Sequence, residues 1–493
     1  MSEQPDPHQP PSSHVEFRDS RRAANRILRA GERKGLRRFI AFIFVGTAAI
    51  WTWRQLTAGL DADERSVLFL FLLAVGLWIT EAVPAFAVGL LIMGYLVFVF
   101  GTPIGDAEVR DITPYLDTWS SPVIWLMLGG FFMADAMSRT GLDRRLFRVA
   151  MRPAGDRPER VLLAIMLTSA VASMFISNTS ATALLIGAVL PFVRALGTEQ
   201  PFSRALLVGI PLAASVGGMG TIIGSPPNAI AAGAAARAGS EINFVAWMGV
   251  GIPLALTLVL LSWRFLLRRY PAGDELDATL GLDDGAPPEL TLRRDRRVVA
   301  GICLTTIILW ITEPLHGIHV SLISMIPIVG LTMSQITGAS QVRGLPWDTL
   351  MLVAGGLSLG AAVVDSGLAA RIAGGIEEMT GGAPDLTIFL LLALLTVTLS
   401  NFMSNTATVS LILPVAVAMV PDRALELCLI LGLSGSCALL LPVSTPPNAI
   451  AFSTGLITTR DLRPTGLLIG LLGPLLILLW VPLTVYLAGL VSG

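Results

Sequence analysis

The sequence predicts an all-α polytopic membrane protein with about eleven transmembrane helices and two re-entrant helical hairpins, built as an inverted repeat. Of the 493 residues, 53% are hydrophobic and only 14% are charged, which is too few to cover a water-soluble surface. The mean hydropathy is +0.72. Apolar runs of about 20 residues, the length that crosses a bilayer core, recur along the chain. Several motifs of its first half reappear in its second half.

Residues 1–38 differ from the rest because they are polar, rich in proline at first and then rich in arginine. They lack the short apolar core that a cleaved signal needs directly after a basic start. We expect a disordered tail that leads into a basic segment at the cytoplasmic membrane surface. The net charge of −1 indicates no nucleic-acid partner. The three cysteines lie in apolar segments without the spacing of a zinc site or a disulfide framework.

Apolar segments provide the candidate crossings of a lipid bilayer. They cover approximately residues 39–58, 66–82, 84–100, 119–138, 204–232, 244–264, 298–315, 318–336, 348–367, 424–452 and 464–491. Two further apolar stretches, 161–196 and 386–420, are interrupted in the middle by a polar triplet. Each could be one crossing or a hairpin that enters the membrane and returns.

Loop charge favours the hairpins. If the N-terminus is cytoplasmic and both stretches are hairpins, the arginine-rich segments at 139–160 and 264–297 lie inside, as the positive-inside rule requires. Two simple crossings would place the second of these segments outside. We therefore expect a first repeat at 39–263, a cytoplasmic linker at 264–297, a second repeat at 298–493 and an outside C-terminus.

An internal repeat is visible at the ends of two predicted helices. The tetrapeptide Trp78-Ile79-Thr80-Glu81 recurs as Trp310-Ile311-Thr312-Glu313, and a proline follows each copy. In the expected topology the two helices cross the membrane in opposite directions, so the repeat is inverted. Inverted repeats are typical of secondary transporters.

Both interrupted stretches carry the same polar motif at the interruption. The first copy is Ser173 followed by Ser177-Asn178-Thr179, and the second is Ser400 followed by Ser404-Asn405-Thr406. Two serines four residues apart share a helix face, and each triplet lies where the helix should break. Oxygen atoms are thus concentrated at both predicted hairpin tips.

A second paired motif follows each hairpin. Residues 224–228 read Gly-Ser-Pro-Pro-Asn, and residues 444–448 read Ser-Thr-Pro-Pro-Asn. Two prolines remove two backbone donors and push the preceding residue out of the α region, so each crossing should be unwound here. Irregular backbone at this depth is tolerated only where protein or water covers it. Freed carbonyls beside half-helix N-termini predict a cation site next to an anion site.

With these residues the sequence resembles the divalent anion/sodium symporter family, which includes the INDY-type dicarboxylate carriers. The resemblance rests on the Ser-Asn-Thr triplets, the Pro-Pro-Asn loops and the Trp-Ile-Thr-Glu elements, and it covers essentially everything after residue 38. It implies a sodium-coupled carrier of small dianions such as succinate, malate and fumarate. It also implies a homodimer in the bacterial inner membrane, with a stationary scaffold and a transport domain that moves like an elevator.

The resemblance also implies roles for single residues. The substrate would lie against Ser177, Asn178, Thr179, Ser225, Ser404, Asn405, Thr406, Thr445 and Pro446. One sodium ion would be held by Ser173, Ser177, Asn178 and the carbonyl of Gly224. The other would be held by Ser400, Ser404, Asn405 and the carbonyl of Ser444.

The charges near these residues lead to the same expectation independently. Neither tip and neither Pro-Pro loop contains Lys, Arg or His. A dianion bound there would have to be neutralised by cations and by helix N-termini, because an uncompensated buried charge is costly. Substrate affinity should therefore depend on sodium.

Other functions stay open or are disfavoured to different degrees. A dicarboxylate exchanger that needs no sodium gradient and a sulfate carrier would keep the same fold. An intramembrane enzyme would need a buried catalytic dyad or a metal cluster, and the spacing of Asp135, Asp365 and the serines forms neither. A channel is disfavoured because inverted, discontinuous helices suit alternating access better than a continuous pore.

Overall fold

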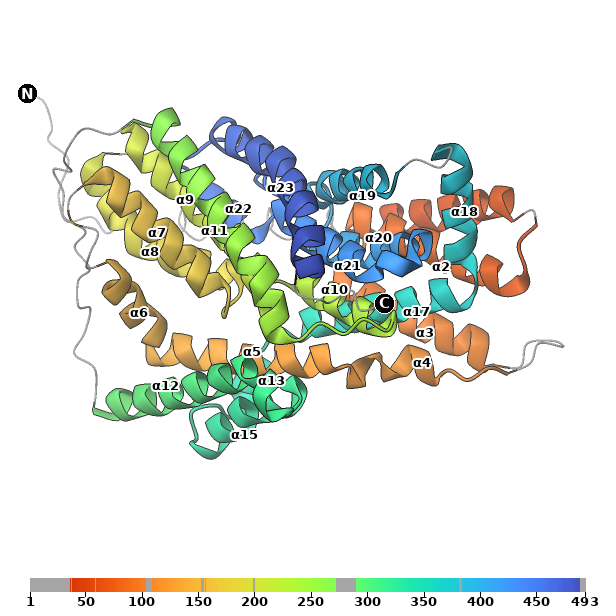
Figure 1. Cartoon of the computed structure of the whole chain (residues 1–493), viewed down its shortest axis with the longest axis horizontal. Coiled ribbons are helices and arrows are strands. Elements are labelled where there is room, and N and C mark those ends of the chain that lie inside the picture. The colour runs from red at the N-terminus through yellow and green to blue at the C-terminus, as the bar shows by residue number, and fades with distance from the viewer. Residues whose placement is uncertain are drawn as a thin grey trace, which may run out of the picture.

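The computed structural model describes residues 38–57, 59–102, 109–151, 157–197, 200–271, 290–380 and 384–487, together with Leu36 and Gly155. Within these residues the chain forms helices and no strand. The molecule is elongated, and helices distant in sequence pack side by side along it (Figure 1). The predicted tail at 1–38 lies almost wholly outside the described residues.

The first half of the chain forms one long series of helices. They are a first helix at Arg38–Leu56, α2 (Ala62–Thr80), α3 (Ala85–Gly101), α4 (Thr113–Leu116), η1 (Asp117–Ser120), α5 (Pro122–Thr140), α6 (Leu142–Met151), α7 (Pro158–Ser173), α8 (Asn178–Leu196), α9 (Pro201–Gly217), η3 (Gly218–Gly220), η4 (Ile222–Gly224), α10 (Pro226–Arg237) and α11 (Phe244–Arg269). Helices α5, α7, α9 and α10 each begin with a proline, whose missing N–H would be unpaired at that position anyway.

The second half repeats this order. Its helices are α12 (Leu290–Ile311), α13 (Glu313–His316), α14 (Val320–Ile323), α15 (Met325–Met333), α16 (Ala339–Arg343), α17 (Trp347–Asp365), α18 (Leu368–Thr380), α19 (Asp385–Ser400), α20 (Asn405–Met419), η5 (Pro421–Arg423), α21 (Ala424–Ser434), η6 (Gly435–Cys437), α22 (Pro446–Ser453) and α23 (Thr459–Leu487). In the part of the chain that is described, seven helical stretches are long and apolar enough to span a membrane, and four shorter ones are also apolar. The predicted all-α polytopic fold is confirmed.

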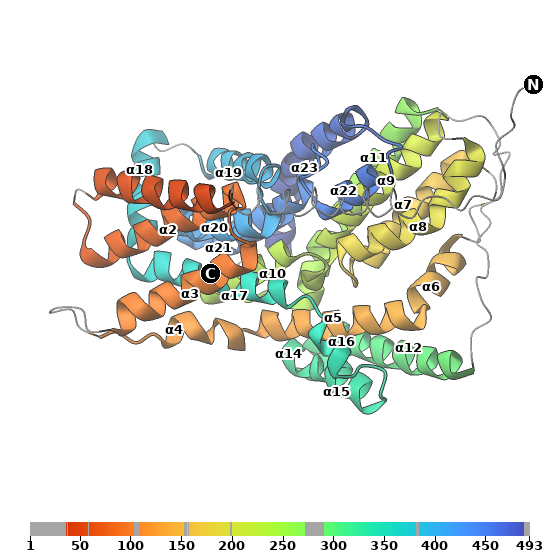
Figure 2. The same ribbon diagram turned by 180° about the vertical axis from the view of Figure 1, so that it is seen from behind.

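The helices break where the polar motifs predicted a break. α7 ends at Ser173 and α8 begins at Asn178, while α19 ends at Ser400 and α20 begins at Asn405. The two helices of each pair contact each other, and α7 and α8 lie side by side in both views (Figures 1 and 2). Each interrupted stretch is therefore a helical hairpin, and its re-entry into the membrane stays a prediction.

Two predicted segments differ from the structure. The crossing at 318–336 is divided into α14 and α15, with Ser324 between them. The linker at 264–297 is helical at both ends, since α11 continues to Arg269 and α12 begins at Leu290; residues 272–289 lie outside the described residues. Basic residues in the last turn of a helix, as in α11, interact favourably with its dipole, so the helix extends past the apolar run.

The repeated tryptophan fixes the corner after each Trp-Ile-Thr-Glu helix. The indole Nε1 of Trp78 donates to the carbonyl of Ala85, at the start of α3, over 3.3 Å. The indole Nε1 of Trp310 donates to the carbonyl of Val320, at the start of α14, also over 3.3 Å. Both side chains are buried, so a buried indole N–H is satisfied in the same way in each repeat.

The repeats exchange contacts through a second pair of equivalent residues. Glu64 lies 14 residues before Trp78, and Arg296 lies 14 residues before Trp310. Glu64 pairs with Arg371 of the second repeat (2.6 Å), whereas Arg296 donates to the carbonyl of Thr140 in the first (3.0 Å). Each half of the chain is therefore held by one contact to the other half. The first contact is an ion pair, and the second is a hydrogen bond to a backbone carbonyl.

Close packing of α3 against α17 depends on glycine at position 355. A Cβ atom on Gly355 would overlap the Cα of Gly89, whereas a Cβ on Gly94 of α3 would meet no atom within 4 Å. We expect Gly355→Ala to force the helices apart at a cost of about 1–3 kcal/mol. Thermal unfolding in detergent should show a lower melting temperature for Gly355→Ala and little change for Gly94→Ala. Equal melting temperatures would contradict this packing.

Candidate functional site

The tip of the first hairpin lies against the unwound segment between α9 and α10. Ser173, at the end of α7, donates its hydroxyl hydrogen to Oδ1 of Asn178 at the start of α8. A Cβ atom on Gly218 would lie 2.7 Å from Oδ1 of Asn178 and 2.9 Å from the carbonyl oxygen of Gly224. Three oxygens that the sequence predicts to bind one sodium ion therefore lie here: Oγ of Ser173, Oδ1 of Asn178 and the carbonyl oxygen of Gly224. Because Gly218 has no side chain, the space next to the last two of these oxygens stays open.

Three side chains hold the unwound segment in place. The Nδ2 of Asn228 donates to the carbonyls of Gly218 and Thr221, both over 2.8 Å. The hydroxyl of Thr221 donates to the carbonyl of Met174 at the hairpin tip and accepts from the N–H of Gly224. The indole of Trp247, on α11, donates to the carbonyl of Met219 over 3.0 Å. These bonds satisfy backbone carbonyls that the break between α9 and α10 leaves without a helical partner.

At the tip of the second hairpin, two predicted sodium ligands are buried without a partner. Neither Oγ of Ser400 nor Oδ1 of Asn405 has a hydrogen bond among the described residues. A buried acceptor left unsatisfied costs about 1–3 kcal/mol, so such groups in a folded protein call for a ligand, an ion or water. The two oxygens come from the last residue of α19 and the first residue of α20.

Asn401 joins this second tip to the segment before α22. Its Oδ1 accepts from the N–H of Leu440 (2.9 Å) and from the hydroxyl of Ser444 (2.8 Å), and its Nδ2 donates to the carbonyl of Val397. The hydroxyl of Ser444 is therefore used to hold the loop, whereas the sequence assigned only its carbonyl to sodium. The Nδ2 of Asn448 donates to the carbonyls of Leu439 and Leu441, which repeats the role of Asn228.

The two half-sites lie next to each other in the core. α10 packs on α20 and α21, and α22 packs on α8 and α9, so each half-helix after a Pro-Pro pair rests on helices of the other repeat. A Cβ on Gly435, in η6 before the second unwound segment, would lie 3.5 Å from the Cβ of Pro227 at the start of α10. The tertiary structure therefore places η6 next to the half-helix that follows the first unwound segment.

The predicted substrate residues differ in how accessible they are. Ser177, Thr179 and Pro446 are exposed, and Asn178, Ser404 and Asn405 are partly buried. Ser225, Thr406 and Thr445 are buried. Two of the hydroxyl oxygens also cap helices, since Ser177 accepts from the N–H of Ser180 and Thr445 accepts from the N–H of Asn448. This set is therefore only partly open to a ligand in the conformation seen here.

The site contains several residues that the sequence did not single out for it. A space or a hydrogen bond is contributed by Gly218, Thr221, Asn401 and Trp247, and no sequence motif marks these four residues. Among the supporting residues, only Asn228 and Asn448 carry a sequence signal, because an asparagine follows the Pro-Pro pair in each half. Thr221 and Asn401 have no equivalent of the same type in the other repeat. A motif comparison between the halves would therefore pass over them.

The two aspartates considered for a catalytic dyad have different surroundings. Oδ2 of Asp135 pairs with Nε of Arg139 one turn away (2.7 Å), whereas Asp365 lines a cavity to which Asp135 does not contribute. Three or more His, Cys, Asp or Glu side chains placed to hold a metal ion are not found in the described part of the chain.

Comparisons with known proteins identify the family. The model of the citrate transporter family CitMHS matches residues 75–425 and 307–493. The sodium-dependent dicarboxylate transporter SdcS of Staphylococcus saprophyticus is 30% identical over 461 residues, covering 85% of this chain and 86% of that protein. The chain belongs to the divalent anion/sodium symporter family. As a symporter-family member it is a transporter rather than an enzyme.

One more relative of this symporter-family chain and one solved structure extend the comparison. SdcS of Staphylococcus aureus is 30% identical over 441 residues, which cover 82% of each protein. The crystal structure of the YdaH transporter of Alcanivorax borkumensis superposes with a TM-score of 0.52 at 17% identity, over 83% of this chain and 98% of that one. This second likeness concerns the fold alone.

The bond network predicts that Thr221 stabilises the first unwound segment. Thr221→Val keeps the shape of the side chain but removes its donor to Met174 and its acceptor for Gly224. Losing such buried bonds costs about 1–3 kcal/mol, so amides of residues 218–225 should exchange hydrogen roughly ten-fold faster or more. The control is Thr257→Val, whose hydroxyl bonds only the carbonyl of Pro253 within α11. Unchanged exchange at 218–225 in Thr221→Val would refute this role.

Proposed function

We propose that the protein is a sodium-coupled symporter of small dianions, with C4-dicarboxylates such as succinate, malate and fumarate as substrates. The observation that carries this proposal is the pair of half-sites, each rich in neutral oxygen atoms and without a basic side chain at its tip or Pro-Pro loop. The relatives described above are named as sodium-dependent dicarboxylate transporters, which supports both the cation and the substrate class.

Sodium at the first half-site would lie among Ser173, Ser177, Asn178 and the carbonyl of Gly224. Hard cations bind oxygen ligands, and unwound carbonyls beside helix ends commonly hold sodium in transporters. The closeness of Asn178 Oδ1 and the Gly224 carbonyl around Gly218 supports this assignment. A cation there would replace the bond between Ser173 and Asn178, because both oxygens would turn to the ion.

Sodium at the second half-site would lie among Ser400, Ser404, Asn405 and the carbonyl of Ser444. The buried, unpartnered oxygens of Ser400 and Asn405 support it, because a cation would satisfy both. The two half-sites are not equivalent. Ser173 and Asn178 bond each other, whereas Ser400 and Asn405 do not, so the second requires no bond to be broken.

The substrate would bind between the two tips. Its carboxylates would meet Ser177, Asn178 and Thr179 on one side and Ser404, Asn405 and Thr406 on the other, with Ser225, Thr445 and Pro446 at the border. Two sodium ions and the N-termini of α8 and α20 would balance its charge. Because no fixed positive charge is available at these tips, sodium should bind before the dianion.

We further propose an elevator mechanism in a homodimer. The moving part would comprise α7–α11 and α19–α23, which carry both half-sites, and the stationary scaffold would comprise α2–α5 and α12–α17. The contact of α17 with α20 supports a smooth boundary between them, because Gly356 and Gly360 of α17 face Ser410 and Pro414 of α20.

The proposed homodimer can be tested by light scattering. The purified protein should give twice the mass of one chain, and a monomer would refute the dimer.

The decisive experiment is uptake of labelled succinate into proteoliposomes with and without an inward sodium gradient. We expect uptake only with sodium, and accumulation that follows the gradient. Equal uptake in choline or potassium would replace the symporter with an exchanger. Uptake of sulfate but not of succinate would replace the substrate class, and absence of uptake for every dianion tested would refute the proposal.

The asparagines at the tips should be indispensable for transport. Asn178→Ala and Asn405→Ala should each reduce succinate uptake by at least about 100-fold, because each amide would contact both the cation and the substrate. Gln200→Ala, which removes an exposed amide before α9, serves as the control. Melting temperatures within a few degrees of the wild type would show that folding is intact. Either asparagine variant retaining most of its uptake would contradict the site.

The serines before the tips should affect sodium more than substrate. We expect Ser173→Ala and Ser400→Ala to raise the sodium concentration for half-maximal uptake about ten-fold or more, with a smaller change in apparent succinate affinity at saturating sodium. Thr168→Val on α7 and Thr396→Val on α19 are matched controls, because their hydroxyls bond only carbonyls of their own helices. A change confined to succinate affinity would move these serines out of the sodium sites.

The arginine-rich segments also lead us to propose a bacterial inner-membrane protein with its N-terminus inside and its C-terminus outside. Single cysteines at Ser12 and at Ser492, in a background whose three native cysteines are replaced by alanine, should react differently with an impermeant thiol reagent. Only the second should be labelled in intact cells. Equal labelling of both would overturn this orientation.

A further inference from the structure

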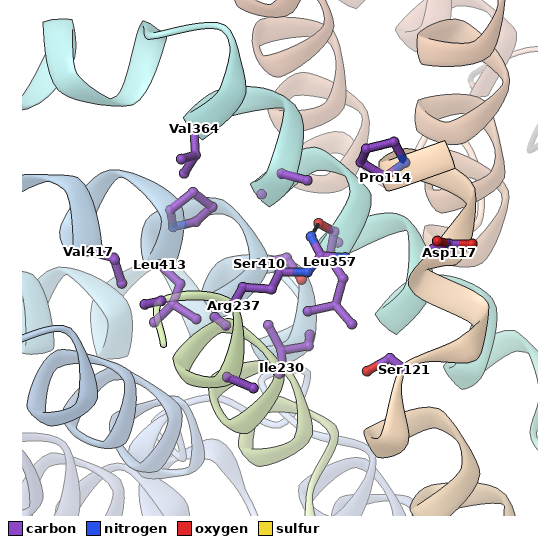
Figure 3. A pocket seen from close by; sticks show the side chains of 18 of the residues that line it. Pro114, Asp117, Ser121, Ile230, Arg237, Leu357, Val364, Ser410, Leu413 and Val417 are labelled. Atoms are coloured by element: carbon purple, nitrogen blue, oxygen red, sulfur yellow. Dashed lines mark hydrogen bonds between the residues drawn. The ribbon is translucent and has the colours of Figure 1, made fainter. Parts of the chain in front are cut away.

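A cavity of about 660 Å³ lies outside the candidate site, between the proposed moving part and the proposed scaffold. α10 and α20 form one side of it, and α17 and the η1–α5 corner form the other (Figure 3). None of the predicted substrate or sodium residues lines it. A volume of this size is typical of sites that bind small organic molecules.

Arg237, at the end of α10, supplies the one positive charge in the lining. Figure 3 shows it in the middle of the cavity, between Leu413 and Leu357. Its Nη1 donates to the carbonyl of Leu357, and no other hydrogen bond of this guanidinium is found within the described residues. An arginine has five N–H donors, so most of them are available to a ligand.

Two carboxylates accompany this arginine. Asp365, at the end of α17, lines the same cavity, and Asp117 lies on the side of the cavity opposite Arg237. All three charged side chains are exposed. A simple anion would therefore be attracted by one charge and repelled by two, whereas a ligand carrying both signs would match the lining.

The rest of the lining is largely apolar. Ile230, Leu357, Val364, Leu413 and Val417 provide aliphatic side chains, and Gly356, Gly360 and Ala361 leave room beside them. Val364, which belongs to a candidate membrane span, is 53% exposed. A hydrocarbon chain would cover these side chains and keep water away from them. A small soluble zwitterion would leave them uncovered.

We propose that this cavity binds one zwitterionic phospholipid, with its phosphate against Arg237, its ammonium group towards Asp117 and Asp365, and one acyl chain along Val364, Leu413 and Val417. The bilayer in which the chain is embedded is the source of the ligand. The binding does not require the proposed transport activity, so the two proposals can fail separately.

Native mass spectrometry of the purified full chain can test this site. Phosphatidylethanolamine and phosphatidylglycerol are added at equal concentration, and bound lipid is counted after release from detergent. We expect the wild type to retain one phosphatidylethanolamine in preference to phosphatidylglycerol. Soluble phosphoethanolamine, which lacks the chains, should not displace it.

Three variants separate the parts of the site. Arg237→Gln should lower retention of phosphatidylethanolamine at least about five-fold, and Asp365→Asn should raise retention of phosphatidylglycerol, because it removes a repulsive charge. Val364→Trp should block the apolar part of the cavity with all charges present. Arg343→Gln, at the end of α16 and outside the cavity, is the control and should retain lipid as the wild type does.

The results decide the proposal in either direction. Equal retention of the two lipids by the wild type, or undiminished retention by Arg237→Gln, would overturn it. Displacement by phosphoethanolamine alone would show a headgroup site without a role for the chain and would also overturn it. If Val364→Trp fails to fold, as judged by its melting temperature, Arg237→Gln and Asp365→Asn still give the answer through their opposite effects.

Discussion

Unwound backbone inside an apolar protein is the constraint on which the rest of this structure depends. Each Pro-Pro pair removes two donors and interrupts a crossing helix, and the freed groups lie where lipid cannot satisfy them. The protein solves this problem with buried side chains. Asn228 and Asn448 each hold two carbonyls, and Trp247 holds one more in the first segment. The carbonyl of Gly224 borders the same space beside Gly218 as Oδ1 of Asn178 at the hairpin tip. The same interruption that costs hydrogen bonds therefore provides oxygen atoms for the proposed cation site.

The repetition of the motifs along the sequence explains why two half-sites are proposed, but the two halves of the chain have diverged in chemistry. Ten residues before the loop asparagine, the first repeat has Gly218 and the second has Ala438. The residue after the first serine of the hairpin motif is Met174 in one repeat and Asn401 in the other. As a result, the first loop is tied to a backbone carbonyl of the hairpin and the second to a side chain. Two sites that look alike in sequence can thus differ in how readily they accept an ion.

The boundary between α17 and α20 combines two kinds of surface. Glycine allows the helices to approach closely at one point, since a Cβ on Gly356 would collide with Ser410. Both of these residues also line the cavity that contains Arg237, so the close contact borders the cavity. A filled cavity would oppose sliding of one helix past the other. The lipid content of this boundary would therefore influence any movement of α20 past α17.

The sequence by itself determined the all-α membrane fold, the positions of the helix breaks and the pairing of the motifs. These features follow from local composition: apolar length, consecutive prolines and repeated triplets act through the few residues around them. It also predicted the family, because four motifs in symmetric order are specific even at 30% identity.

Only the tertiary structure decided which oxygens meet and which residues support them. Gly218 matters because Asn178 and Gly224 approach it from different helices, and Thr221, Asn401 and Trp247 matter because they bridge segments far apart in the chain. The division of the crossing at 318–336 and the helical ends of the linker depended likewise on packing and on helix-end electrostatics. Contacts between distant segments leave no periodic mark in a single sequence, so the hairpin tips could be found from the motifs but their supports could not.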